Sequence, residues 1–154
     1  GIGAEERGQA QAIATNLMEM SEVATPIIAY VIGEGGSGGA LGIGVANRVA
    51  ILQHAYYSVI SPEGCASILW RSSARASDAA KALKIMGEDL LEFGMVDEVI
   101  EEPLGGAHRD PEPVAAAIKK SAIKHFKKLA TLSREEILSE RYERFRKIGK
   151  FQEG

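Results

Sequence analysis

The segment Ile27–Leu41, IIAYVIGEGGSGGAL, most constrains how this chain can fold. It joins an apolar run of six residues, long enough for a buried strand, to a glycine-rich loop. Five of the 17 glycines lie from Gly33 to Gly39, where a backbone without Cβ atoms can come close to a ligand. From Gly38 the chain can enter a helix whose first N–H groups have no partner inside the helix. These amides, with the helix dipole behind them, favour an anion or a developing negative charge.

Two nucleotide-binding motifs fit this loop poorly. A P-loop is excluded because Gly39 and Ala40 stand where that motif requires Lys and Ser or Thr. The dinucleotide-binding pattern G-x-G-x-x-G is met by Gly33, Gly35 and Gly38. That pattern also expects an acidic residue about 20 positions later, and no Asp or Glu occurs from Leu41 to Tyr57. The match is therefore weak.

A third motif, G-x-S-x-G, is met by Gly35, Ser37 and Gly39 and would make Ser37 a nucleophile. A nucleophilic serine needs a base, and the surroundings of the three histidines, at positions 54, 108 and 125, single out none of them. In so glycine-rich a segment, a small hydroxyl that bonds the loop backbone is the more economical interpretation.

Length and composition limit the remaining possibilities. A chain of 154 residues is expected to form one domain with a real core. A net charge of −3 argues against a nucleic-acid partner. Cys65 is the single cysteine, which excludes an internal disulfide and a zinc cluster, and is expected to be a small buried residue. The absence of a long apolar run predicts a soluble intracellular protein with no membrane contact. Because the chain starts at Gly1 without Met, we expect it to be part of a longer polypeptide.

Hydrophobic periodicity predicts alternating helices and strands, and hence an α/β fold. Helices are expected at 4–22, 40–46, 61–71, 77–86, 88–93, 114–129 and 133–148. Strands are expected at 27–32, 49–53, 57–60 and 95–100. Ser77 is predicted to cap its helix and Gly87 to end it, while Ser133 and Glu136 should form a capping box.

The C-terminal third of the sequence carries two further expectations. The irregular segment 103–113 holds His108, Arg109 and Asp110, which are more typical here of a solvated loop or partner contact than of catalysis. Residues 133–154 are predicted to form an exposed amphipathic arm that docks on a partner. We therefore expect a subunit contact through the region from Pro103 to the C-terminus, and no stable monomer.

Three long motifs carry a resemblance to a known family, namely VIGEGGSGGALGIGVANRVAIL, SVISPEGCASILW and MVDEVIEEPLGGAH. They closely resemble the α subunit of the carboxyltransferase of bacterial and plastid acetyl-CoA carboxylase. The resemblance covers essentially the whole chain. It implies the C-terminal portion of a crotonase-like domain, a ββα spiral whose members stabilise an oxyanion with two backbone N–H groups.

The resemblance also implies a reaction. The family transfers the carboxyl group of carboxybiotin to acetyl-CoA and forms malonyl-CoA, the first committed step of fatty acid synthesis. Gly38 and Gly39 match its α-side oxyanion hole, which holds the ureido oxygen of biotin, and the biotin nitrogen would act as the base. The resemblance places substrate-binding residues at Gly35, Gly36, Ser37, Ala40, Ser61, Pro62, Glu63 and Gly64. No metal is expected on this chain.

The implied partners are a carboxyltransferase β subunit, the biotin carboxyl carrier protein and biotin carboxylase. The family forms an α2β2 assembly with its active site between the α and β subunits, in the bacterial cytoplasm or the plastid stroma. Two alternatives stay open at this point. One is a Clp-type serine peptidase that uses Ser37, and the other is a non-catalytic scaffold subunit.

Overall fold

A computed structural model describes residues 2–149 of the chain, and its core contains two parallel sheets. The larger sheet has the order β1-β3-β5, formed by β1 (Ile28–Val31), β3 (Arg48–Leu52) and β5 (Glu98–Ile100). The smaller sheet pairs β2 (Glu34–Gly36) with β4 (Tyr56–Ser58). β3 lies at the centre of the larger sheet, and Val49, Ala50 and Ile51 are almost inaccessible. Its continuous apolar run suits a strand that is covered on both faces.

The strands belong to two consecutive ββα units. The first unit runs from β1 through β2 into α3 (Ser37–Gly44), and the second from β3 through β4 into α4 (Pro62–Trp70). Each strand of the first unit pairs in parallel with its counterpart in the second, in a register that sets Ile28 beside Arg48 and Gly35 beside Tyr57. This stacking confirms the predicted α/β class and the ββα spiral.

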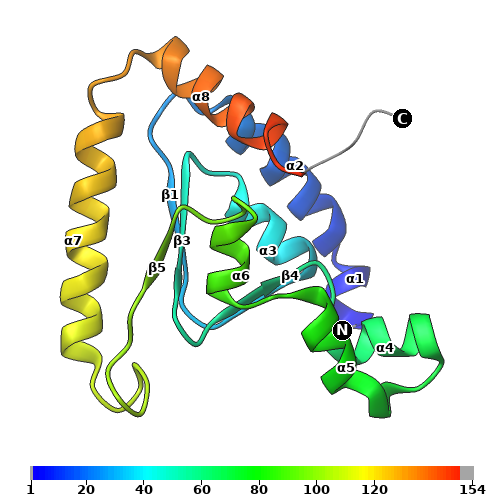
Figure 1. Cartoon of the computed structure of the whole chain (residues 1–154). Coiled ribbons are helices and arrows are strands. Elements are labelled where there is room, and N and C mark those ends of the chain that lie inside the picture. Colours follow the sequence, from blue (N-terminus) through cyan, green and yellow to red (C-terminus); the bar gives the residue numbers. More distant parts are fainter. Residues whose placement is uncertain (1, 150–154) are drawn as a thin grey trace, which may run out of the picture.

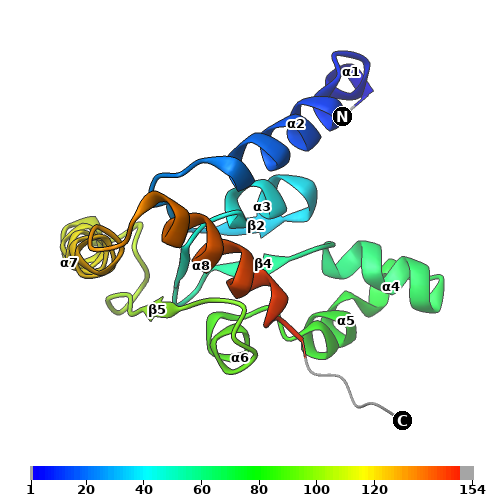
Figure 2. The same ribbon diagram turned by 90° about the horizontal axis from the view of Figure 1, so that it is seen from above.

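Helices cover the sheet and extend to one side of it (Figure 1). α7 (Pro111–Leu129) packs against β1 and β5, while α2 (Gln9–Glu22) packs against α3. α4 forms a small satellite core with η1 (Ser73–Arg75) and α5 (Ala76–Leu83), built on Cys65, Ala66 and Ala79. Seen from above, α2 and the α4–α5 pair point away from α7 (Figure 2). None of the helices within residues 2–149 combines the length and apolar character that crossing a bilayer requires.

The first predicted helix, 4–22, is wrong in one respect, because it is two helices. α1 (Ile2–Glu6) ends before Arg7 and α2 begins at Gln9. Gly8 between them has φ of 80°, a left-handed conformation that glycine takes without steric cost. The apolar spacing continues across this break, so periodicity alone could not reveal it.

The predicted boundaries around 77–100 also need correction. Ser77 lies inside α5 and does not cap it. The helix ends earlier than expected, because Lys84 takes the left-handed conformation at its C-terminus, with φ of 51°. Gly87 does not end a helix but opens α6 (Gly87–Glu92), where Ile51 and Val99 leave little room for a side chain. β5 occupies only the second half of the predicted strand 95–100.

The remaining elements lie close to their predicted positions. α3 starts at Ser37 and ends at Gly44, where 40–46 was expected, and the glycine loop before it contains the unpredicted strand β2. β3 and β4 begin one residue early, and α7 begins at Pro111 instead of residue 114. α4 agrees closely, Cys65 is buried as expected, and the capping box of Ser133 and Glu136 is confirmed.

The last helix, α8 (Arg134–Arg146), does not behave as the exposed arm that was expected. It lies across α2 and the start of β3, and Ile137 and Arg141 are among the most buried side chains described (Figure 1). Its neighbour Glu140 pairs with Arg48 at the start of β3. The prediction was wrong because charge patterning cannot show that an arginine is buried. Residues 150–154 of the predicted arm lie outside the described residues.

Arg141 holds α8 to the segment between α2 and β1. Its guanidinium donates hydrogen bonds to the carbonyl oxygens of Met20 at 2.9 Å, Val23 at 2.8 Å and Thr25 at 2.8 Å. It also donates to the Oδ1 atom of Asn47 at 2.8 Å. The planar guanidinium carries five N–H donors, so one side chain can bond several carbonyl groups at the end of α2 and just beyond it.

Candidate active site

The N-terminus of α3 offers two backbone N–H groups that are free to bind a ligand. Gly36, the residue before the helix, has no side chain that could accept a hydrogen bond, and none caps the helix. Among residues 2–149, neither the Gly38 nor the Gly39 amide donates to a backbone or side-chain acceptor. Since the first amides of a helix lack intrahelical partners and carry the positive end of its dipole, these two groups suit a negatively charged oxygen.

The surroundings of the two glycines differ. A Cβ atom placed on Gly39 would have no heavy atom within 4 Å, so this side of the helix is open. A Cβ atom on Gly38 would lie 3.7 Å from the Cδ1 atom of Ile13, which places Gly38 against α2. Neither glycine lines either of the two cavities described below. Any ligand at these amides would therefore approach from the open Gly39 side.

Ser37 precedes these amides, and its backbone is left-handed, with φ of 57°. The described part of the chain brings no histidine into hydrogen-bond contact with its hydroxyl. His125 is buried, and its Nε2 atom lies 2.7 Å from a carboxylate oxygen of Glu98. Residues 2–149 thus bring no histidine base to a nucleophilic Ser37.

The predicted residues Ser61–Gly64 form the N-terminus of α4. Ser61 accepts a hydrogen bond from the Gly64 amide at 3.1 Å, Pro62 occupies the first turn, and Glu63 lies near the positive end of the helix dipole. All four thus have a structural role in starting the helix, and none lines a described cavity. Their part in substrate binding stays a prediction.

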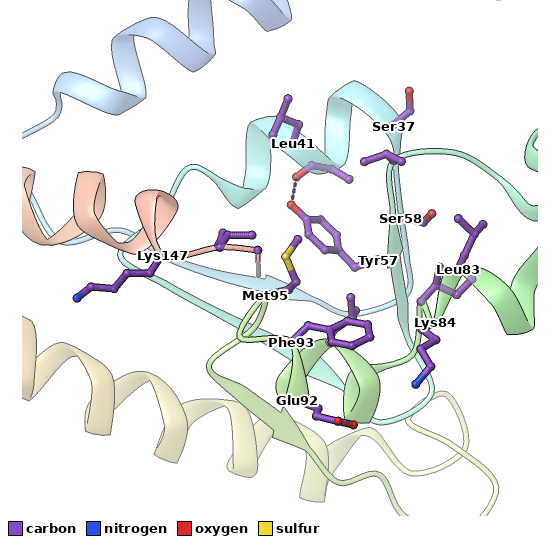
Figure 3. A pocket seen from close by; sticks show the side chains of 16 residues that line it. Ser37, Leu41, Tyr57, Ser58, Leu83, Lys84, Glu92, Phe93, Met95 and Lys147 are labelled. Atoms are coloured by element: carbon purple, nitrogen blue, oxygen red, sulfur yellow. Dashed lines mark hydrogen bonds between the residues drawn. The ribbon is translucent and has the colours of Figure 1, made fainter. Parts of the chain in front are cut away.

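A largely apolar cavity of about 620 Å³ lies beside α3 (Figure 3). Ser37 and Ala40, both predicted site residues, line it together with residues of β4, α6 and the segment that follows α8. Tyr57, Phe93 and Met95 lie at its centre, while the charged ends of Lys84, Glu92 and Lys147 point outward (Figure 3). A smaller cavity of about 200 Å³ on the other side of Tyr57 is lined by Gly35 and Ala40.

Tyr57 is a residue of the site that sequence reasoning missed. It lines both cavities, and its hydroxyl donates a hydrogen bond to the Ala40 carbonyl oxygen at 2.8 Å. Burial raises the pKa of this phenol, against an opposing effect of the positive charge of Arg144, so the hydroxyl stays a donor at neutral pH. The signal in the sequence was the glycine content of α3. Glycines inside a helix indicate close packing, which occurs here at Gly44, against Tyr57, whereas Gly42 faces open space.

The described residues contain no group of His, Cys, Asp and Glu side chains that could hold a metal ion. The polar groups of this site include the Gly38 and Gly39 amides and the hydroxyl groups of Ser37 and Tyr57.

Comparison with known proteins agrees with this geometry. The sequence model of the family described as "Acetyl co-enzyme A carboxylase carboxyltransferase-like" matches residues 1–149. Acetyl-coenzyme A carboxylase carboxyl transferase subunit alpha of Rhodopirellula baltica is 58% identical over 99% of this chain and 48% of its own length. The protein of the same name from Chlamydia pneumoniae is 55% identical over 99% of this chain and 47% of its own length. The chain thus spans about half the length of these relatives.

Solved structures share the fold at low sequence identity. A Pseudomonas malonate decarboxylase hetero-tetramer in complex with coenzyme A has a TM-score of 0.67 and 18% identity, over 92% of this chain and 56% of the other. Transcarboxylase 12S with hydrolysed methylmalonyl-coenzyme A has a TM-score of 0.57 and 23% identity, over 80% of this chain and 24% of the other.

The stacked ββα units, with a glycine-rich helix start beside them, define a protein of the crotonase-type fold. Within that class, the chain belongs to the acetyl-CoA carboxylase carboxyltransferase family, because the family's sequence model covers nearly all of it.

Proposed function

We propose that this chain is the carboxyltransferase part of an acetyl-CoA carboxylase α subunit, acting in the transfer of a carboxyl group from carboxybiotin to acetyl-CoA. Two unpaired amides at Gly38 and Gly39, at the start of a helix open on one side, carry this proposal. The family membership and the names of the relatives support it. No observation favours a peptidase or a scaffold over it.

The role of these amides follows from where charge develops. Carboxybiotin would supply the carboxyl group, and its departure leaves negative charge on the ureido oxygen. The Gly38 and Gly39 N–H groups donate to that oxygen, and the α3 dipole adds to the stabilisation. Because the backbone holds them in place before the reaction, little reorganisation is needed. The loss of one such donor typically lowers the rate by about 100- to 1000-fold.

The proposal extends to the rest of the site and to the assembly. Gly35, Gly36, Ser37 and Ala40 flank the amides, and the start of α4 at Ser61–Gly64 would supply further substrate contacts. The name "subunit alpha" of the relatives supports a β subunit as partner. An α2β2 assembly, the biotin carboxyl carrier protein, biotin carboxylase, a role in fatty acid synthesis, and a bacterial cytoplasmic or plastid location follow from the family resemblance alone.

Gly39→Val in the complete α subunit, assembled with its β subunit, tests the oxyanion role. A Cβ atom at this position would have no heavy atom within 4 Å, so the fold should tolerate a valine while its side chain blocks the open side of the amides. We expect malonyl-CoA formation to fall by about 100-fold or more, with thermal unfolding and subunit assembly unchanged. Gly42→Val is a matched control, because it places the same side chain on the same helix, also in open space, one turn further on. Normal malonyl-CoA formation in Gly39→Val would refute the oxyanion assignment.

Ser37 provides a separate test against the peptidase alternative. With no histidine bonded to its hydroxyl in the described structure, Ser37 should not react with a fluorophosphonate probe. Ser37→Ala should keep most of its carboxyl transfer activity. A covalent adduct on Ser37, detected by mass spectrometry, would instead support the peptidase.

A further inference from the structure

We propose that Tyr57 is a positioning residue for the Gly38–Gly39 amides, acting through the carbonyl group of Ala40. The inference rests on the proposed function, because it gives a purpose to the placement of α3. Tyr57 itself is not assigned a contact with substrate. Its hydroxyl bonds the helix one residue beyond Gly39, so whatever shifts this bond shifts the two amides.

Helix α3 needs external support. Four of its eight residues are glycine, which is a poor helix former because its unfolded backbone is so flexible. No side chain caps its N-terminus, and Ser37 in its first position has a left-handed backbone. A helix with so few stabilising features of its own keeps its position only through contacts with neighbouring elements.

Tyr57 supplies a rigid contact from the smaller sheet. Its backbone is paired with Gly35 in the β2–β4 register, and its N–H donates to the Ile85 carbonyl oxygen at 3.0 Å. From this fixed strand the half-buried ring reaches under α3, and the hydroxyl donates to the Ala40 carbonyl at 2.8 Å (Figure 3). The strand and the helix are therefore joined by one directional hydrogen bond.

Two glycines make room for this ring. A Cβ atom on Gly35 would lie 2.9 Å from the Cδ2 atom of Tyr57 and 3.3 Å from the carbonyl oxygen of Tyr56. A Cβ atom on Gly44 would overlap the Tyr57 hydroxyl oxygen, whereas the ring carbon that bears it would be 3.4 Å away. Only glycine at position 44 leaves the hydroxyl where it can reach Ala40. The glycines of this region thus serve two purposes, since Gly38 and Gly39 expose amides while Gly35 and Gly44 admit the ring.

Tyr57→Phe in the assembled enzyme removes the hydrogen bond and keeps the ring. We expect amide hydrogen exchange in α3 to become about fivefold faster, which is the effect of losing one hydrogen bond, while exchange in α7 is unchanged. The kcat of carboxyl transfer should fall by at least about fivefold, with the KM for acetyl-CoA within about twofold of wild type, because the amides act on the transition state. Tyr142→Phe, which alters an exposed tyrosine on α8, is the matched control and should change neither readout.

A double-mutant cycle with Gly44→Ala identifies the hydroxyl as the group responsible. The added methyl group overlaps the hydroxyl when Tyr57 is present, and meets the ring only at ordinary contact distance once Tyr57→Phe has removed that hydroxyl. We therefore expect Gly44→Ala to lower kcat and loosen α3 in the wild type. In combination with Tyr57→Phe it should cause no further loss.

Unchanged exchange in α3 of Tyr57→Phe would overturn the inference, whatever the activity. Equal costs of Gly44→Ala in both backgrounds would overturn it as well. Faster exchange with an unchanged kcat would show that α3 is anchored by Tyr57 but that the anchor has no catalytic purpose, which also overturns it. Gly39→Val then separates the two proposals, because its activity reports on the oxyanion role without involving the Tyr57 contact.

Discussion

At the scale of single residues, the carboxylate of Glu98 contacts three polar side chains, although nothing in the sequence singled this residue out. This residue of β5 accepts hydrogen bonds from Ser121 at 2.5 Å and Lys124 at 2.7 Å, and lies 2.7 Å from His125. All three partners belong to α7. Burial alone would raise the pKa of the carboxyl group, but these hydrogen bonds outweigh it and lower the pKa from 4.5 to about 2.

This lowered pKa predicts a specific pH dependence. A carboxyl group with a lower pKa in the folded state stabilises the fold above pH 4.5, and that contribution is lost as the pH falls towards 2. Because the group is partly exposed, we expect Glu98→Gln to cost on the order of 1–2 kcal/mol at neutral pH, and less near about pH 3. Urea unfolding at both pH values measures the difference, with the exposed Glu101→Gln as control. An equal cost at both pH values would contradict this account.

At the scale of elements, α8 illustrates how one buried arginine fixes a helix to a distant part of the chain. Removing the Arg141 guanidinium would remove a donor from the carbonyl groups of Met20, Val23 and Thr25, and Met20 would keep only its bond from the Val23 amide. Burial lowers the pKa of Arg141, against the attraction of neighbouring Glu140, but arginine stays charged in proteins. Its charge is thus balanced mainly by backbone oxygens.

We expect Arg141→Met to destabilise the chain by about 2–4 kcal/mol, because all the hydrogen bonds of a buried charged side chain are lost at once. Arg141→Lys should recover little of this loss, since an ammonium group cannot span the same set of oxygens. Arg146→Met, at an exposed position near the end of α8, is the matched control. Denaturant unfolding monitored by circular dichroism provides the measurement. Similar unfolding free energies for the two methionine variants would show that the hydrogen bonds of Arg141 contribute little to stability.

The same contacts determine what deletion of the C-terminal helix should do. If residues from Ser133 onward formed an exposed arm, they could be removed while the core stayed intact. With Asn47 and Arg48 at the start of β3 bonded to Ile137 and Glu140, the deletion should instead destabilise the sheet. Hydrogen exchange of β3 in the truncated chain tests this, and full protection of β3 would show that α8 is dispensable.

At the scale of the whole molecule, many large apolar side chains lie on the surface. They occur on α2, α3, α4 and the loop that precedes α7, where Leu104 is fully exposed. Gly105 and Gly106 next to it have φ values of 96° and 90°, and Glu102 accepts a hydrogen bond from the Ala107 amide. The loop is therefore held in a defined conformation that exposes Leu104. A passive linker would lack such fixed contacts.

We expect Leu104→Asp to weaken association with the β subunit, or between copies of this chain, without lowering thermal stability. Sedimentation velocity over a concentration series measures the association, and Ala116→Asp on the exposed side of α7 serves as control. A chain that sediments as a compact monomer in the presence of the β subunit would remove the basis for this surface role.

The sequence predicted the order of most elements, though not β2, because apolar runs, glycines and prolines mark their boundaries locally. It predicted the glycine loop before α3 and the capping box of Ser133 for the same reason. It could not predict that Arg141 is buried or that Tyr57 anchors α3, because both depend on partners 17 or more residues away. The break at Gly8 was missed for a different reason, since one glycine within a periodic pattern is compatible with either outcome.

The bonds of Arg141 also set an order of events during synthesis of the chain. The carbonyl groups that it binds lie 116 to 121 residues earlier in the sequence. At about 5–20 residues per second, the ribosome needs roughly 6–24 s to make that intervening stretch. Throughout this interval the segment between α2 and β1 has been made but Arg141 has not. The nascent chain therefore passes through a stage in which this segment lacks the hydrogen bonds that later hold it to α8.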